Sequence, residues 1–170
     1  ITIVRHPDGS YYILLKSGDQ IGVIKVSATG IVVWDKRYGG SDEDWPSAIT
    51  VRSDGGVVIS GYTYSDDGDV GANAGGADAW QFALSSDGSI EWSQVVGTDQ
   101  EERFFDHILT EDGGYLLVGS RTYLNSGLEY AAWVVKTDIN GNLEWEKELA
   151  VPGENEAYCV LQKTDTSYLV

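Results

Sequence analysis

The chain has 170 residues, about the length of one domain, and 11 Lys and Arg residues face 27 Asp and Glu residues, for a formal net charge of −16 at pH 7. This charge repels phosphate, which argues against nucleic acid as a partner and disfavours anionic lipid surfaces. No apolar run reaches the roughly 20 residues that span a bilayer, so we expect no membrane insertion within this segment.

In chain order, each part of the sequence reads as short strands separated by turns, and the second repeat unit shows this best. Its predicted strands, rich in Val, Ile, Tyr or Trp, are 48–51, 57–62, 79–84 and 89–96. The links SDGG at 53–56 and SSDGS at 85–89 predict tight hairpins, because Asp and Gly tolerate positive φ. Alternation in the last strand predicts that Ile90, Trp92 and Gln94 share one face. No window shows helical periodicity, so the sequence predicts an all-β fold.

The strands belong to a repeat that is marked by Gly-x-x-x-Trp, which occurs at 30–34, 88–92 and 141–145. Twenty residues after each Trp stands an Asp that opens a turn. The pairs are Trp34 and Asp54, Trp92 and Asp112, and Trp145 and Asp165. The constant spacing indicates a part of each unit that is fixed by packing, while length varies in one loop per unit. Five of the six Trp lie at repeat positions, and we expect these five in the core.

Four antiparallel strands that recur every 46 to 58 residues are typical of β-propeller blades. Coils of a β-helix or leucine-rich repeat are shorter, and a β-sandwich does not predict the fixed Trp-to-Asp spacing. The predicted units are 1–47, 48–106, 107–157 and a partial 158–170. Since propellers close with about 4–8 blades, we expect the remaining blades in missing sequence, with both chain ends as cuts in a longer polypeptide, or in other copies.

The segments DGGYLLVGS at 112–120 and AAWVVKTDINGNLEWEKEL at 131–149 resemble the tandem repeats of large secreted or surface-anchored bacterial and archaeal proteins, which are mostly uncharacterised. Those repeats read roughly DGGYIVAG, a variable loop, then D-x-WVVK-x-D-x-x-GN-x-x-W. The match covers nearly the whole chain and is weakest in 1–40, where Gly22 replaces the first Trp. The resemblance implies a β-propeller in an extracellular protein, secreted or on the cell surface, and it implies no catalytic residue.

The acidic, Gly-rich loop YSDDGDVGANAGGAD at 64–78 is the candidate metal site. Ca²⁺ takes about six to eight oxygen ligands, which flexible Asp-Gly loops supply. The spacing does not match an EF-hand, so the alternative is a solvated loop whose Asp residues make turns. We expect no required cofactor, and Ca²⁺ is the one ion that this loop is suited to bind. The candidate ligands are Asp66, Asp67, Asp69, Asn73 and Asp78.

Trp45 is the one Trp outside the repeat, and Arg103 and Glu156 stand at its equivalent places. Because a residue that varies between units is free of the packing rule, we predict a surface of aromatic side chains that stacks on a glycan or anchors a protein partner. The alternative is that Trp45 packs against the neighbouring blade. The candidate ligand-binding residues are Trp45, Tyr62, Tyr64, Tyr123 and Tyr130.

Catalytic motifs such as HExxH, a Walker loop or a GxSxG elbow do not occur in the sequence. We therefore expect a non-catalytic binding or structural segment of a secreted or cell-surface protein, with no catalytic residue assigned. One alternative is a carbohydrate-active hydrolase or lyase with two carboxylates about 5 to 9.5 Å apart on the loop face; another is a structural spacer. The single cysteine, Cys159, is expected to be buried, since it lies in the apolar stretch AYCVL.

Overall fold

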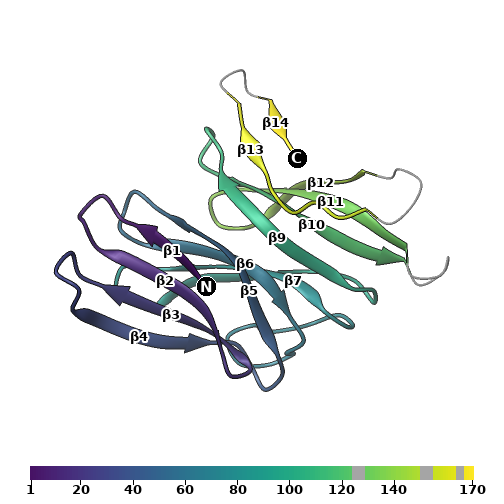
Figure 1. Ribbon diagram of the computed structural model, residues 1–170. Coiled ribbons are helices and arrows are strands. Elements are labelled where there is room, and N and C mark those ends of the chain that lie inside the picture. Colours follow the sequence, from purple (N-terminus) through teal and green to yellow (C-terminus); the bar gives the residue numbers. More distant parts are fainter. Residues whose placement is uncertain (124–128, 150–154, 164–166) are drawn as a thin grey trace.

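The computed structural model describes residues 1–123, 129–149, 155–163 and 167–170, without the side chains of Tyr123 and Glu129, and the regular structure there consists of β-strands. Three four-stranded antiparallel sheets follow one another in chain order, and a two-stranded sheet comes last (Figure 1). This confirms the predicted all-β fold with repeated four-stranded sheets that resemble propeller blades; closure of a ring stays a prediction.

Three of the four strands predicted for the second unit match the structure to within one residue, whereas the first begins at Asp44, four residues before the predicted start. The first sheet contains β1 (Thr2–Arg5), β2 (Tyr11–Ser17), β3 (Gln20–Val26) and β4 (Val32–Tyr38). The second contains β5 (Asp44–Val51), β6 (Val57–Thr63), β7 (Asp78–Leu84) and β8 (Ile90–Val96). The third contains β9 (Glu102–Leu109), β10 (Tyr115–Tyr123), β11 (Glu129–Thr137) and β12 (Leu143–Leu149). The two-stranded sheet contains β13 (Leu161–Gln162) and β14 (Tyr168–Leu169).

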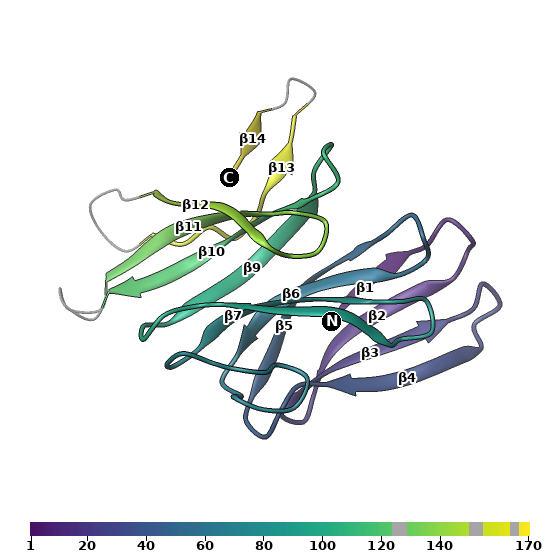
Figure 2. The ribbon, with the colours of Figure 1, turned by 180° about the vertical axis from the view of Figure 1, so that it is seen from behind.

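The core lies between consecutive sheets, whose order in space follows their order in the chain, as the view from behind also shows (Figure 2). The first strands are the inner ones, since β5 contacts both β1 and β9. Between the first and second sheets, Tyr12 and Trp80 are buried in one apolar layer. Between the second and third sheets, Phe104 and Trp133 are buried in the next layer. Trp80 and Trp133 are therefore core residues, as predicted from the repeat.

A β-bulge stands before the repeated Trp of each outer strand. In the second sheet, Trp92 pairs with Ala83 but Ile90 pairs with Leu84, so Glu91 is an extra residue. The extra residue reverses the alternation of side chains. Ile90 therefore packs toward the first sheet and Trp92 toward the third, and the predicted shared face is wrong. The same register shift precedes Trp34 and Trp145.

Two of these outer Trp side chains pack on the hairpin of the following sheet. The Trp34 Nε1 donates to the Ser86 carbonyl at 3.1 Å, and a Cβ on Gly88 would lie 3.2 Å from the Trp34 ring. A Cβ on Gly141 would lie 2.6 Å from the Trp92 ring. Gly88 and Gly141 have φ of 79° and 77°, so glycine serves both the turn and the close approach of the indole.

Two expectations about burial are wrong. Trp145 is 46% exposed, because no hairpin equivalent to those at Gly88 and Gly141 covers it within the described ranges. Cys159 is exposed as well, because Ala157 and Val160 are the side chains of its segment that pack against the third sheet.

Candidate functional site

One edge of the sheets carries the links β2–β3, β4–β5, β6–β7 and β8–β9, and we call this edge the loop rim. A similar backbone hydrogen bond occurs three times on this rim. The donor is an N–H at the start of an inner strand or, in the third case, in the segment that leads to β13. The acceptor is a carbonyl just before, or at the start of, the third strand of the preceding sheet. The pairs are Asp44 to Asp19 at 2.7 Å, Glu102 to Ala77 at 2.7 Å and Asn155 to Tyr130 at 2.8 Å. The rim is therefore held by the backbone, whatever side chains stand there.

Three of the five predicted ligand-binding residues come together on the loop rim. The rings of Trp45 and Tyr62 stack with their centroids 6.1 Å apart and 9° between their planes, and Tyr64 meets Tyr62 edge-on at 6.3 Å. Trp45 and Tyr64 are each 37% exposed. The Lys16 Nζ lies 4.6 Å from the Trp45 ring centroid, and the Arg103 guanidinium lies 5.1 Å from that of Tyr62. The cluster is thus a pair of stacked rings with a cation against each ring.

Polar contacts hold this cluster in place. The Trp45 Nε1 donates to the Glu43 carboxylate at 3.0 Å. The Arg103 Nη2 donates to the Tyr64 hydroxyl at 3.2 Å and forms an ion pair with Glu101 at 2.7 Å. Burial raises the pKa of the Tyr62 hydroxyl, and the nearby Arg103 opposes this rise. Lys16 belongs to the first sheet and Arg103 to the third, so the cluster links three sheets. Trp45 therefore also contacts a neighbouring sheet, which was the alternative to ligand binding.

The two other predicted ligand-binding residues lie elsewhere. Tyr130 lines a hollow of about 430 Å³ together with Asn155, Glu156 and Tyr158. The side chain of Tyr123 lies outside the described part of the chain. Sequence reasoning missed Tyr158, although the rule that selected Trp45 applies to it as well, since the residue type at its place differs between the repeat units.

Three of the predicted calcium ligands lie in the first part of the acidic loop. The Asp67 Oδ1 accepts the Ser41 N–H at 2.7 Å, and the Asp69 Oδ2 accepts the Gly39 N–H at 3.2 Å. These bonds tie the β6–β7 loop to the β4–β5 link. Asp66 is exposed.

Asp78 and Asn73, the other two predicted ligands, stand at the end of the same loop. Asp78 is fully buried, and its Oδ2 accepts the Ala74 N–H at 2.7 Å. Burial raises the pKa of this carboxyl, and the nearby Glu102 carboxylate raises it further. The Asn73 Nδ2 donates to the Thr63 and Gly76 carbonyls. The side chains described by the structure include no group of three or more His, Cys, Asp or Glu that could hold a metal ion, and calcium binding stays a prediction.

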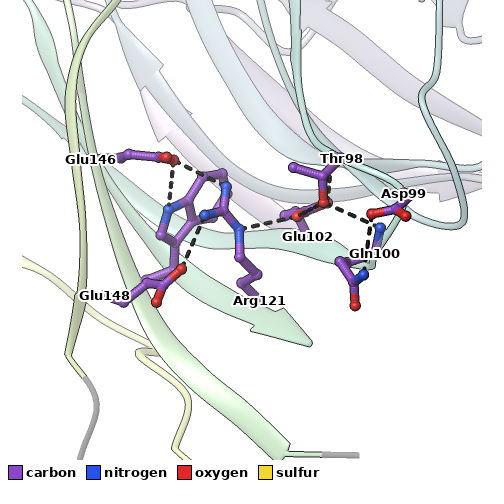
Figure 3. A network of polar contacts seen from close by, with 8 residues as sticks. Thr98, Asp99, Gln100, Glu102, Arg121, Glu146 and Glu148 are labelled. Carbon is purple, nitrogen blue, oxygen red and sulfur yellow. Dashed lines mark hydrogen bonds and ion pairs between the residues drawn. The ribbon is translucent and has the colours of Figure 1, made fainter. Parts of the chain in front are cut away.

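The loop rim of the third sheet contains an ion-pair network around Arg121 (Figure 3). Its three carboxylate partners are Glu102 at 3.0 Å, Glu146 at 3.0 Å and Glu148 at 3.1 Å. The guanidinium also lies 4.6 Å from the Trp133 ring centroid. Glu102 is fully buried and bound to Arg121, so its carboxylate is closed to a substrate. Glu146 and Glu148 are partly exposed, and each is paired with Arg121.

A Ser–His pair is buried between the second and third sheets. The Ser60 Oγ and the His107 Nδ1 are 2.6 Å apart, and both residues are buried. The His107 Nε2 has no hydrogen-bond partner among the residues described. Burial lowers the pKa of His107 to about 4, against a smaller opposite effect of Asp106. Without access to solvent, this pair does not form a nucleophile and base for a substrate.

No model of a known protein family matches the chain. The chain is similar to the regulatory protein FlaEY of Caulobacter vibrioides, with 31% identity over 105 residues. The match covers 58% of this chain but 11% of that protein, so the chain spans a small part of the relative's length. No helix in the described ranges is both long and apolar enough to cross a bilayer.

Proposed function

We propose that the chain is a non-catalytic binding module of a secreted or cell-surface protein, and that it contacts a glycan or protein ligand through the loop rim. The observation that carries this proposal is the exposed cluster of Trp45, Tyr62 and Tyr64. In the third sheet, Ser120 and Thr122 occupy the positions equivalent to Tyr62 and Tyr64. Aromatic side chains provide contact area at interfaces, and a residue that the repeat does not require is free to serve a ligand.

Three carboxylates of the loop rim are closed to a substrate, which removes them as a catalytic pair of a hydrolase or lyase. Glycoside-cleaving enzymes present two accessible carboxyl groups to the bond that is cleaved. On the loop rim, Asp44, Asp78 and Glu102 are fully buried. A name such as regulatory protein, which the Caulobacter relative carries, is compatible with a binding role.

We also propose that further four-stranded sheets of the same repeat complete a propeller, either in sequence outside these residues or in other copies. Exposed apolar side chains at the last outer strand support this proposal. Leu143, Trp145 and Leu149 are 50%, 46% and 38% exposed on β12. In the two earlier sheets, the Trp equivalent to Trp145 packs on the next hairpin.

The binding role is tested by presenting the chain to arrays of glycans and of extracellular proteins. The double variant Trp45→Ala/Tyr64→Ala removes the exposed rings of the loop rim. The matched control Leu109→Ala/Ile139→Ala removes two apolar side chains, 43% and 57% exposed, from the opposite edge. We expect at least a tenfold loss of binding in the first variant and none in the control. Equal binding by both variants, or release of reducing ends from a polysaccharide, would refute the proposal.

A further inference from the structure

The hollow beside Tyr130 has the size and lining of a small-molecule site. Its volume of about 430 Å³ falls within the range of about 300–1,000 Å³ that is typical of ligand pockets. The hollows beside Trp45 and beside Arg52 measure about 240 and 150 Å³ and fall below it. A second hollow of about 410 Å³ shares Asn155, Glu156 and Tyr158 and continues toward apolar side chains such as Ala132 and Ala157. The site therefore has a polar wall and an apolar wall.

Tyr158 presents an open ring in this hollow. Its side chain is 65% exposed, and its ring stacks on Phe105 with the centroids 5.0 Å apart and 15° between the planes. The Tyr158 hydroxyl donates to the Glu156 carboxylate. One side of the ring is thus supported by Phe105, the hydroxyl end is fixed, and the remaining surface faces solvent. Such a ring keeps its position without a ligand, which lowers the entropy lost on binding.

The polar lining selects the charge of the ligand. The lining includes the amide of Asn155 and the carboxylate of Glu156, and a bond from the Asn155 N–H to the Tyr130 carbonyl at 2.8 Å holds the backbone beside them. The lining residues that the structure describes include no Lys or Arg, and the whole chain carries a net charge of −16. An anionic ligand is therefore repelled, whereas neutral hydroxyl groups can donate to the carboxylate.

We propose that this hollow binds a neutral pyranose sugar, with one face of the sugar ring on Tyr158 and its hydroxyl groups on Glu156 and Asn155. The inference rests on the proposed binding function and names its ligand class. Quaternary ammonium ligands are recognised by rings that surround the cation. Here Phe105 and Tyr158 stack on each other and present a single plane, which matches the flat apolar face of a pyranose.

The test measures binding of methyl β-galactopyranoside, methyl β-glucopyranoside and N-acetylneuraminic acid to the whole chain by saturation-transfer NMR and titration. We expect at least one of the two neutral sugars to bind and the anionic sugar to bind at least tenfold more weakly. Tyr158→Ala should weaken the binding about tenfold, and Tyr158→Phe, which keeps the ring, should retain most of it. Leu109→Ala, on the edge opposite the loop rim, is the matched control and should leave the affinity unchanged.

Each other outcome overturns a definite part of this inference. If Tyr158→Ala binds the sugars as the parent does while Trp45→Ala does not, the site is wrong and the binding function stands. If N-acetylneuraminic acid binds as tightly as the neutral sugars, the ligand class is wrong. If neither neutral sugar binds, the inference is refuted, while protein ligands on the arrays still decide the proposed function. Circular dichroism of each variant confirms folding, which the exposure of Tyr158 leads us to expect.

Discussion

Acid should weaken the fold through His107, which lies between the second and third sheets with its Nδ1 bonded to Ser60 and its Nε2 without a partner among the residues described. Burial holds the pKa of His107 near 4, against an ordinary value of 6.5. In the unfolded chain the imidazole takes a proton near its ordinary pKa, whereas in the folded chain it stays neutral until about pH 4. The unfolded state therefore binds more protons between these two values, and stability falls as the pH is lowered through this window.

The two pKa values set the size of the effect. A difference of one pKa unit corresponds to about 1.4 kcal/mol, so the complete loss due to His107 is about 3 kcal/mol. About 2 kcal/mol of it should be lost at pH 5, and none above pH 7. Below pH 4 both states are protonated, so His107 contributes no further change. For a domain of this size, a loss of this order is a large share of the free energy of unfolding.

The repeat itself provides the control. Ile49 and Val160 stand at the place of His107 in the neighbouring units, and both are buried. The variant His107→Ile, combined with Ser60→Ala so that no hydroxyl loses its partner, removes the titrating group and keeps an apolar side chain of a kind the fold accepts there. Urea unfolding followed by Trp fluorescence, at steps from pH 7.5 to pH 4.5, gives the free energy of unfolding of both proteins.

We expect the difference between parent and variant to change by about 2 kcal/mol between pH 7 and pH 5. Carboxyl groups whose pKa burial raises, such as Asp44 and Asp78, act with the opposite sign but occur in both proteins and cancel. Parallel pH profiles would refute the reasoning. The chain has two histidines, so an NMR titration can follow the imidazole signals of His107 separately and measure its pKa. A pKa near 6.5 in the folded protein would also refute the reasoning.

Two further predictions concern packing between and within the sheets. Trp34→Ala and Trp92→Ala should each lower the free energy of unfolding by about 2–4 kcal/mol, because both indoles pack on the next hairpin. Trp145→Ala, at the equivalent but half-exposed position, should lower it by less than about 1 kcal/mol. Urea unfolding compares the three variants, and equal losses would contradict the packing described. Gly61→Ala should cost more than about 2 kcal/mol, because its Cβ would lie 1.9 Å from the Trp45 carbonyl oxygen; an unchanged melting temperature would contradict this.

Local sequence signals were sufficient for the strands and their turns. Asp54 and Asp112 open their turns as predicted, since each Oδ1 accepts the N–H two residues later, at Gly56 and Gly114, at 3.0 Å. Burial of Trp80 and Trp133 was predictable for a similar reason, because the repeat fixes their place in the packing. These features depend on residues that are close in the sequence or on the constant spacing of the repeat.

Features that depend on the pairing register were not predictable from the alternation pattern. The bulge at Glu91 reverses the faces of Ile90 and Trp92, and no residue type in that strand marks it. The hollow between Tyr130 and Tyr158 depends on how the third sheet meets the segment that follows it. Trp45, in contrast, could be found as a site candidate, because the comparison between units showed that the repeat does not require it.

The side chains of the loop rim differ between sheets that share the same fold, and this supports the proposed role of the rim in ligand contact. In the second sheet, Asp44 pairs in register with Thr63 and accepts its hydroxyl, whereas in the third sheet Glu102 pairs with Arg121 and forms an ion pair. Both arrangements stand beside the same backbone bond to the preceding sheet. That backbone bond and the apolar layers hold the sheets together. A side chain on the rim therefore has to match only the side chain that pairs with it across the strands. We therefore expect ligand contacts at junctions between sheets whose side chains vary between the repeat units, at Trp45 and at Tyr158.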